Sequence, residues 1–529
     1  MLLSLAVLPN VVLAQQEQAL PTFEELEADG AVIGEIRIDS RDIFDLDDPK
    51  ENNALYRLAN TLHIRTRPDV IRRALLFHSG EPVSAQRIQE TERNLRGLSY
   101  LYDVQIRPIS YKDGIVDIEV VTRDSWTLDP GLGFSRKGGD NESKYGLKEV
   151  NLLGTGIAIE WQRTEVAEGT EDQFQFANNQ MFGSRVRLSY NYDDLVNAEL
   201  HSIAVVRPFY SLDSRWTAGI QGSTLDQLAT VSGADYQRNR YAASAFGGWS
   251  RGLVDGWTHR YSAGLNFVED TYELLPGQSA GIETPLDETR VSPFVRYEVI
   301  EDRFVETKNR NKVERPEYFL LGFASNITIG YAATALGSTR PAWTYAASIN
   351  KGWDFSRDRI LVARGAVAGV YADGDDEEQL ISANVQYFAP QSNRAQSFIG
   401  LAVDAANNAF ENAQLTLGGK NGLSGYPTDY QSGNRRVLLN LEQRLYSDWY
   451  PFRLFRVGGG VFLDTGRAWH DEQTGAGDNA WLSSVGFGLR LFSVRSAFGT
   501  VWRLDIAFPI NPPDDVPDHQ ILFYRSTNF

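Results

Sequence analysis

Two serine-centred patterns are the first places in this sequence where covalent chemistry could occur. Gly-Trp-Ser-Arg-Gly at 248–252 and Gly-Gln-Ser-Ala-Gly at 277–281 both have the Gly-x-Ser-x-Gly spacing. In esterases that spacing exposes a serine nucleophile on a sharp turn between a strand and a helix. No helical periodicity follows Ser250 or Ser279, and a chain with 46 glycines contains such spacings by chance. An esterase is therefore the weakest interpretation, and we expect no enzymatic activity.

Other residue types that serve metals, cofactors or nucleic acids form no pattern here. The 6 histidines are scattered, no cysteine is present, and no phosphate-binding loop occurs. The acidic run that begins at Asp373 could bind a divalent cation, but such runs are more often solvated loops. The formal net charge of -18 argues against a phosphate-backbone partner, which needs clustered Lys and Arg. We expect no cofactor, no metal and no nucleic acid.

The N-terminus predicts export. Residues 1–14 form a short apolar run that ends at Ala14 and is followed by glutamines, which is typical of a cleaved signal peptide. The run lacks Lys and Arg and contains Pro9, so a buried first strand is the alternative. Residues 15–31 are expected to be a linker. Beyond residue 14 no apolar run reaches about 18 residues, so only a closed β-barrel could span a membrane.

A small α+β domain is predicted over residues 32–124. The expected order is strand, helix, helix, strand, strand, at 32–40, from Pro68, from Ser84, at 100–109 and at 114–124. The first helix is expected to run to a stop at Ser79-Gly80, and Gly97 to end the second in a left-handed conformation. A turn at 112–114 should join the last two strands as a hairpin. The acidic stretch 45–53 is interpreted as a solvated loop.

From residue 127 to 529 the sequence alternates in runs of about ten residues, as strands do. In one run Val437, Leu439 and Leu441 oppose Asn440, Glu442 and Arg444. A transmembrane antiparallel β-barrel explains this alternation, with apolar side chains toward lipid and polar ones toward the lumen. About twenty runs occur, and an even number would return the C-terminus to the side of the N-terminal domain. A soluble propeller or tandem sandwiches are the competing class.

The connections between these runs differ in length. Those at 152–156 and 181–185 are short enough for turns, whereas the polar segments 224–240 and 372–379 are expected to be surface loops. Residues 301–318 are an exception, because they are too long for a turn on the side with short connections.

Two stretches resemble a known family. The element order of residues 32–124, together with the stretch 78–106, resembles a POTRA domain, the module that accompanies bacterial outer-membrane assembly and secretion barrels. Residues 417–469 resemble the barrel of the bacterial surface antigen superfamily, which comprises outer-membrane protein assembly factors and two-partner secretion proteins. The resemblance implies a barrel of 16 strands, which we prefer to the count of twenty, and a Gram-negative outer-membrane location with the POTRA domain in the periplasm.

The resemblance also implies a function and partners. The barrel would assemble or translocate polypeptides, with an unfolded client captured by the POTRA domain through strand addition. Its surroundings would be the lipid bilayer and lipopolysaccharide, with periplasmic chaperones or lipoproteins as further partners. A surface antigen or channel of the same fold that moves no protein is the alternative, as is a POTRA domain that serves only as a spacer.

The same resemblance places a motif at the tip of an inward-folded loop. The motif corresponds to Leu423, Ser424, Gly425 and Tyr426, with Ser424 where the family usually has Arg. The expected lumenal wall residues are Glu442, Arg444, Asp464 and Gly466. Because a carboxylate in a partly dry lumen needs a partner, we expect Lys420, Arg436 or Arg444 nearby. Without the Arg, the loop should be anchored more weakly than in the family.

A weak seam is the last expected feature. In the family the first and last strands pair weakly, so that the wall can open sideways. Here the first strand, 127–138, contains Pro130, Gly131 and Gly133, which remove a ladder hydrogen bond and side-chain packing. The last strand, 519–529, contains Phe523, becomes polar at Arg525 and ends at Phe529. Ordinary barrel curvature and a frayed terminus would explain the same residues.

Overall fold

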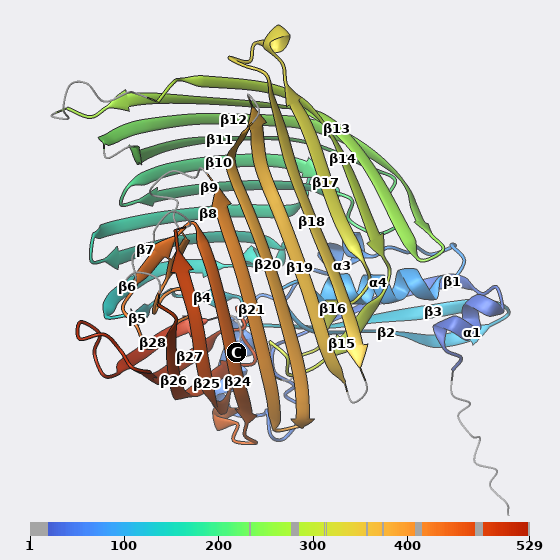
Figure 1. Cartoon of the computed structure of the whole chain (residues 1–529). Helices are drawn as coiled ribbons and strands as arrows, with labels where there is room; N and C mark the ends of the chain where they lie inside the picture. Colours follow the sequence, from blue (N-terminus) through green and yellow to red (C-terminus); the bar gives the residue numbers. More distant parts are fainter. Residues whose placement is uncertain are drawn as a thin grey trace, which may run out of the picture.

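The chain forms an α+β domain and a β-barrel, one against the other (Figure 1). The computed structural model describes residues 20–231, 234–276, 285–311, 313, 315–355, 358–372, 375–407, 415–470 and 480–526. The predicted signal peptide, the start of the predicted linker, Ser279 and Phe529 lie outside these residues.

The α+β domain has one three-stranded sheet covered by helices. Its elements are α1 (Phe23–Ala28), β1 (Val32–Arg41), α2 (Ala54–Leu62), α3 (Pro68–Ala74), α4 (Ala85–Arg96), β2 (Leu101–Lys112) and β3 (Ile115–Asp124). The sheet order is β1-β3-β2, with β1 parallel and β2 antiparallel to β3. Its core is apolar, and Leu26, Ile71, Leu101, Val104 and Ile118 are at most 1% exposed. The predicted hairpin is present, with Asp113 and Gly114 at positive φ as a tight turn requires.

Several local predictions in this domain were wrong. Two helices, α1 and α2, were missed, and α2 directly follows the stretch interpreted as a loop. Asn53 explains where α2 begins, because its side chain accepts a hydrogen bond from the Tyr56 amide. Helix α3 ends at Ala74, short of the expected stop at Ser79-Gly80. Gly97 caps α4 with φ −71°, in the right-handed rather than the left-handed region.

The barrel is built from long antiparallel strands. Its first half contains β4 (Leu128–Asp129), β5 (Gly133–Lys137), β6 (Asp140–Glu149), β7 (Ile157–Val166), β8 (Gly169–Met181), β9 (Val186–Leu195), β10 (Ala198–Arg207), β11 (Trp216–Val231), β12 (Ala234–Val254), β13 (Trp257–Leu274) and β14 (Glu288–Glu301). Its second half contains β17 (Ala324–Ala332), β18 (Ala342–Phe355), β19 (Arg359–Ala372), β20 (Asp375–Ser392), β21 (Ala395–Asn407), β24 (Arg435–Tyr446), β25 (Phe455–Trp469), β26 (Leu482–Ser493), β27 (Val501–Pro509) and β28 (Gln520–Ser526).

Within the described residues the cylinder closes with 20 strands, because β4 and β5 both pair with β6 and are two parts of one strand. The count from alternation is therefore confirmed, and the preferred value of 16 is wrong. The two segments expected as surface loops were also assigned wrongly. Most of 224–240 belongs to β11 and β12, and much of 372–379 belongs to β20. Polar residues there continue the ladder as strands longer than a bilayer requires.

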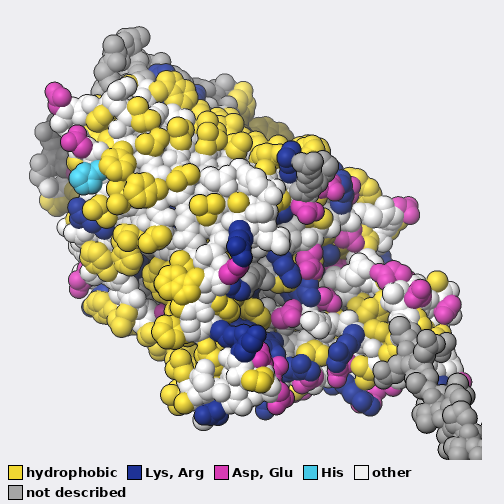
Figure 2. Space-filling model, turned by 90° about the horizontal axis from the view of Figure 1, so that it is seen from below, with side chains coloured by type: hydrophobic (Ala, Val, Ile, Leu, Met, Phe, Trp, Pro, Cys, Tyr) yellow, Lys and Arg dark blue, Asp and Glu magenta, His cyan; other side chains and the backbone are white. Residues whose placement is uncertain are grey.

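The side chains of the wall divide between two faces. Phe487 and Leu489 on β26 and Leu504 on β27 are 52%, 62% and 45% exposed, whereas Arg490 and Asp505 between them are each 1% exposed. Figure 2 shows hydrophobic side chains spread over the outer face of the barrel and charged ones gathered toward the α+β domain. The outward-apolar, inward-polar arrangement predicted from the sequence is confirmed. None of the described helices is both long and apolar enough to cross a membrane.

The α+β domain lies against one end of the barrel, here called the near rim. Its residues bind turns along this rim through Thr66 with Asn151, Arg67 with Leu153, Leu75 with Arg185, Glu90 with Leu212, Tyr56 with Phe452 and Glu51 with Arg495. The short connections at 152–156 and 181–185 are among these near-rim turns. Two further hairpins lie apart from the barrel sheet, β15 (Phe304–Thr307) with β16 (Glu317–Leu320) and β22 (Leu415–Leu417) with β23 (Gln431–Gly433).

Candidate functional site: the inner loop and the seam

The inner loop, residues 415–433, packs against the inward side of strands from the second half of the barrel. Its ends pair as β22 and β23. At its tip Leu423 and Tyr426 are 0% and 1% exposed. They belong to one apolar cluster with Leu438 on β24 and Leu482 on β26. Burial of these side chains fixes the loop against the wall.

Ser424 lies directly on the wall, beside the carboxylate of Asp464 on β25. Its hydroxyl donates to Asp464 Oδ2 at 2.8 Å, and its amide lies 3.3 Å from the same oxygen. Asn440 Nδ2 donates to the other carboxylate oxygen at 2.7 Å and to the carbonyl of Gly422 at 3.1 Å. Because Asp464 is only 4% exposed, these neutral donors replace much of its lost hydration.

Two predicted glycines lie where a side chain would collide with the wall. A Cβ on Gly425 would be 2.6 Å from the Cβ of Ser484 and 3.0 Å from the nitrogen of Pro509. A Cβ on Gly466 would be 2.7 Å from the carbonyl oxygen of Val437 and 3.1 Å from Leu417 of the loop. Both glycines therefore permit the close approach of loop and wall.

Glu442 belongs to a separate charged cluster on the lumenal face. Arg444 Nε lies 3.0 Å from Glu442, and Arg490 and Arg503 approach it at 3.5 and 3.9 Å. Arg490 also forms an ion pair with Asp505, and Arg503 lies 3.3 Å from Asp505. Three arginines thus surround two carboxylates, and the side chain of Arg490 is completely buried. Such a cluster is stable only while every buried charge keeps its partners.

The cations expected near the two lumenal carboxylates are distributed differently. Arg444 does pair with Glu442, but Arg436 pairs with Asp404 at 2.7 Å. Lys420 pairs with Glu142 on β6 at 3.2 Å. Although burial opposes the shift, its hydrogen bond with Glu142 raises the pKa of Lys420. Neither Arg436 nor Lys420 forms an ion pair with Asp464 or Glu442 in the part of the chain that the structure describes.

The seam between the first and last strands is short. Among the described residues one register pair joins β28 to β5, Phe523 opposite Arg136. By contrast β24 and β25 are in register from Arg435 to Tyr446. The first strand is interrupted between β4 and β5 at Pro130 and Gly131, where Gly131 has φ +65° and a Cβ would lie 2.8 Å from the Gly146 backbone. Gly133 begins β5.

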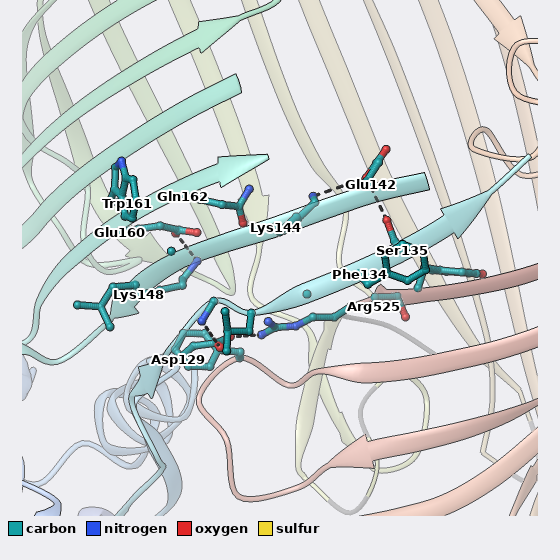
Figure 3. A pocket seen from close by; sticks show the side chains of 18 of the residues that line it. Asp129, Phe134, Ser135, Glu142, Lys144, Lys148, Glu160, Trp161, Gln162 and Arg525 are labelled. Carbon is teal, nitrogen blue, oxygen red and sulfur yellow. Dashed lines mark hydrogen bonds and ion pairs between the residues drawn. The ribbon is translucent and has the colours of Figure 1, made fainter. Parts of the chain in front are cut away.

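A cavity of about 990 Å³ lies at this interrupted part of the seam, between β5, β6 and the end of β28. Figure 3 shows charged and aromatic side chains in its lining, with Arg525 directed at Asp129 and Lys148 at Glu160. Lys137 places its ammonium 4.0 Å from the ring centroid of Tyr524. Side chains therefore carry much of the contact between the two terminal strands.

The inner loop also binds the first hairpin of the barrel, which the sequence did not indicate. The amide of Thr428 donates to the carbonyl of Gly138 at 3.0 Å, and its hydroxyl to the carbonyl of Lys137 at 3.3 Å. Gly138 adopts φ +57°, and a Cβ there would lie 2.4 Å from the Thr428 nitrogen. The sequence did not indicate that Gly138 would contact the inner loop. One loop thus contacts the seam strand and the lumenal wall.

Ser250 lies in a setting unlike that of a nucleophile. It is 0% exposed within β12. Its hydroxyl donates to the carbonyl of His259 and accepts from the amide of Gly252. The hydroxyl therefore holds a β-bulge together instead of facing a substrate.

The Omp85 superfamily domain matches residues 151–529. The chain belongs to the Omp85 superfamily. Solved structures similar to it include CdiB from Escherichia coli, with 12% identity and a TM-score of 0.49 over 94% of this chain and 77% of that one. BamA from Haemophilus ducreyi lacking POTRA domains 1–3 has 13% identity and a TM-score of 0.40 over 94% and 84%. No curated protein matches the chain.

Membership in the Omp85 superfamily supports conclusions about the general role and the location of the protein. The superfamily consists of transporters and assembly factors that are not enzymes, and it supports a protein-assembly or translocation barrel. It also points to the outer membrane of Gram-negative bacteria. The resemblance found in residues 417–469 therefore led to the correct superfamily.

Proposed function

We propose that this Omp85 barrel inserts polypeptide clients into the outer membrane through its seam. The supporting observation is the contrast between the single register pair that joins the described residues of β28 and β5 and the long register of β24 with β25. Each ladder hydrogen bond contributes about 1 kcal/mol, so a seam with few of them costs little to open. A client strand can then pair with the freed edge of β5 or β28.

The α+β domain acts in this proposal as a periplasmic POTRA domain that receives the client. Its sheet has two edge strands, β1 and β2, where an extended segment can add. Side chains of α4 already bind part of β2, since Arg96 Nε donates to the Val104 carbonyl and Glu92 accepts from the Ile106 amide. A photocrosslinking residue at Arg37 in β1 or at Arg107 in β2 would identify the edge used. Capture at neither edge would leave the domain a spacer.

A reversible lock on the seam tests the insertion step. The chain has no cysteine, so Arg136→Cys with Phe523→Cys introduces one defined pair. In liposomes containing the oxidised protein, a urea-denatured eight-stranded barrel should fold no faster than in empty liposomes. Reduction should restore the acceleration. If the oxidised protein still accelerates folding, the client does not pass through this seam.

The matched control is a lock away from the seam. Ile203 and Gly222 are register partners on β10 and β11, and a Cβ on Gly222 meets nothing closer than 3.6 Å. Oxidised Ile203→Cys with Gly222→Cys should therefore leave the acceleration unchanged. If the unlocked wild-type protein accelerates nothing while forming ion-conducting channels, the barrel is a channel of the same fold and the insertion role is wrong.

A further inference from the structure

Helix α2 turns an apolar face away from the protein. Leu55, Leu58 and Leu62 are 53%, 55% and 65% exposed, and their spacing of three and four residues places them on one side of the helix. On the other side Tyr56 is 3% exposed and stacks on Phe44, with ring centroids 4.2 Å apart. The helix is thus attached by one face and presents leucines on another.

Helix α2 is attached to a turn of the barrel that carries an exposed apolar side chain. The Tyr56 hydroxyl donates to the carbonyl of Phe452, in the turn between β24 and β25, and Arg453 of that turn pairs with Asp48 at 3.3 Å. Phe452 is 73% exposed, and Leu445 on the outer face of β24 is 47% exposed. The helix therefore lies beside the near rim, where the apolar belt ends.

Other turns of the near rim show the same unusual combination. Leu153, Phe182 and Phe452 are 55%, 92% and 73% exposed, and each has a positive φ of 52° or 53°. A left-handed conformation is unfavourable for bulky side chains, and exposure to water adds a second cost. Transfer of these side chains from water into partly apolar surroundings, as at the boundary between headgroups and acyl chains, lowers the free energy and can offset both costs.

We propose that the leucine face of α2 and these turn tips lie in the headgroup boundary of the adjacent membrane leaflet. An amphipathic helix in that position lies flat with its apolar side toward the acyl chains. Because α2 belongs to the α+β domain, the contact holds this domain against the membrane as well as against the barrel. The occupant of the leucine face is lipid, because α2 is bonded to a near-rim turn whose Phe452 is exposed beside the lipid-facing Leu445.

A probe on single cysteines tests this placement. An environment-sensitive fluorophore on Leu62→Cys should be quenched at least twofold more by headgroup-level spin-labelled phospholipids than the same probe on Arg57→Cys. Arg57 is exposed on another side of the same helix. The difference should persist at high lipid-to-protein ratios. Equal quenching overturns the proposal, and a difference lost on dilution assigns the face to a second copy instead of lipid.

A second inference comes from the long connection at 301–318. Residues 302–322, here called the plug segment, connect β14 to β17 at the near rim, and residues 312 and 314 lie outside the described part. The segment folds back as the β15–β16 hairpin between the α+β domain and the barrel wall (Figure 1). The segment contacts both the barrel wall and the α+β domain.

Polar contacts on the wall side hold the main chain of the plug segment. Arg444 Nη1 donates to the carbonyl of Arg310 at 2.7 Å, and the Tyr446 hydroxyl donates to the carbonyl of Asn309 at 3.1 Å. Arg310 Nη1 donates in turn to Gln396 Oε1 at 2.9 Å. Since Arg444 also pairs with Glu442, the tip of the segment lies against the lumenal charged cluster.

Apolar contacts extend this attachment around the inner wall. Phe319 and Leu321 pack with Ile360, Val362 and Phe388 on β19 and β20. Val313 packs with Phe492 and Val501 on β26 and β27. The segment thus reaches from the strands beside its own base to strands near the seam.

On its other side the plug segment binds the α+β domain. Arg96 Nη1 lies 2.8 Å from Glu306 and 2.7 Å from the Tyr318 hydroxyl, and Arg93 lies over the ring of Phe304 at 3.8 Å. Arg315 Nη2 donates to the carbonyl of Leu101 at 2.8 Å. Burial lowers the pKa of Arg315, whose side chain lies between domain and barrel.

We infer that the plug segment closes the near-rim mouth of the barrel and that a conducting lumen requires its withdrawal. The segment contacts inner-wall strands from β19 to β27 on one side, and the α+β domain contacts the segment on its other side. Withdrawal breaks main-chain hydrogen bonds and apolar contacts that are independent of the barrel ladder, so the strands stay paired. Ion conductance measures this closure without any client, so the result does not depend on the proposed insertion role.

Shortening the segment is the direct test. Replacing residues 308–315 by Gly-Ser-Gly removes the tip and keeps the paired ends of β15 and β16. In planar bilayers the single-channel conductance should rise at least threefold over that of the wild-type chain. A barrel that is folded by heat-modifiable gel mobility and still conducts like the wild type overturns the inference.

Two full-length variants test the same inference if the shortened chain does not fold. Val313→Asp places a charge in the apolar cluster with Phe492 and Val501, so the fraction of time in the open state should rise severalfold. Bridging Arg310→Cys to Gln396→Cys with a short bis-methanethiosulfonate reagent, which forms a disulfide with each cysteine and releases methanesulfinate, should remove openings, and reduction should restore them. Arg310→Cys alone, treated with the same reagent, is the control. Openings that persist in the bridged protein contradict a closing role.

Discussion

The inner loop and the seam show two ways in which parts of one barrel are held together. At the loop tip Leu423 and Tyr426 are almost completely buried, and Ser424 is hydrogen-bonded to a buried carboxylate. At the seam one register pair joins the described residues of β28 and β5, beside a cavity of about 990 Å³. Interior packing and paired buried charges resist separation far more than exposed ion pairs do. The wall from β24 to β27, where the loop packs, should therefore resist separation more than the seam between β28 and β5.

The largest effect should come from removing a buried cation on the strong side. Arg490→Ala removes a completely buried arginine that pairs with both Glu442 and Asp505, leaving Arg503 as the only arginine near Asp505 among the described residues, and should lower the free energy of unfolding by about 3–5 kcal/mol. Arg525→Ala at the seam removes a pair that is 39% exposed on the arginine side, and should cost at most about 1 kcal/mol. Denaturant unfolding of both variants in lipid vesicles, followed by tryptophan fluorescence, checks the ratio. Equal losses of unfolding free energy in the two variants would contradict a difference in strength between the loop region and the seam.

Alanine substitutions at two glycines compare the packing of the loop tip with that of the seam, without changing any charge. Gly425→Ala places a Cβ 2.6 Å from Ser484 and should destabilise the loop contact by about 1–3 kcal/mol. Gly133→Ala at the seam places a Cβ 3.7 Å from Lys144, an ordinary contact, and should change stability by less than about 0.5 kcal/mol. The same unfolding measurement applies. A larger loss at residue 133 would mean that the seam is packed as tightly as the loop.

A smaller effect is expected from the two serines that bind carboxylates. Ser424→Ala removes the hydroxyl that satisfies Asp464 and should cost about 1–2 kcal/mol, because the carboxylate stays buried. Ser135→Ala removes a bond to Glu142 at the seam, where Lys420 also binds, and should cost about 0.5 kcal/mol. Limited proteolysis within 415–433 gives a second readout, which should accelerate only for Ser424→Ala. Acceleration in both variants would contradict a local effect.

The sequence predicted the barrel wall well because alternation is a local property. Each residue of β26 or β27 faces lipid or lumen according to its position in the strand, so Leu489 and Arg490 could be assigned without knowing their neighbours. The number of strands also followed from alternation. The preference for 16 strands failed because it came from the resemblance and not from the residues. The expected surface loops failed for another reason, since polar strand ends such as those in β11 and β12 extend past the membrane.

Contacts between distant segments could not be predicted in this way. The partner of Asp464 was expected to be a cation, but the register of β24 against β25 places Asn440 opposite it. The plug segment was recognised only as too long, because its partners on α4 and β24 depend on how the domain docks. Helix α2 was missed although Leu55, Leu58 and Leu62 recur at helical spacing. What that spacing could not show is that the leucines face away from the protein.

The smallest effect on stability should come from the contact that joins the two regions. Lys420 of the inner loop reaches Glu142 on β6 at 3.2 Å and Asp140 at 3.8 Å, with 31% of its side chain exposed. Lys420→Ala should therefore change the free energy of unfolding by less than about 1 kcal/mol. Its effect should appear at the seam, because the first hairpin loses a tether to the loop. The disulfide between Arg136→Cys and Phe523→Cys should form more slowly in that background. Lys144→Ala removes a cation 3.9 Å from the same Glu142 without touching the loop, and should leave the rate unchanged. If both lysine variants slow the disulfide equally, Glu142 only needs a nearby charge and the loop does not hold the seam.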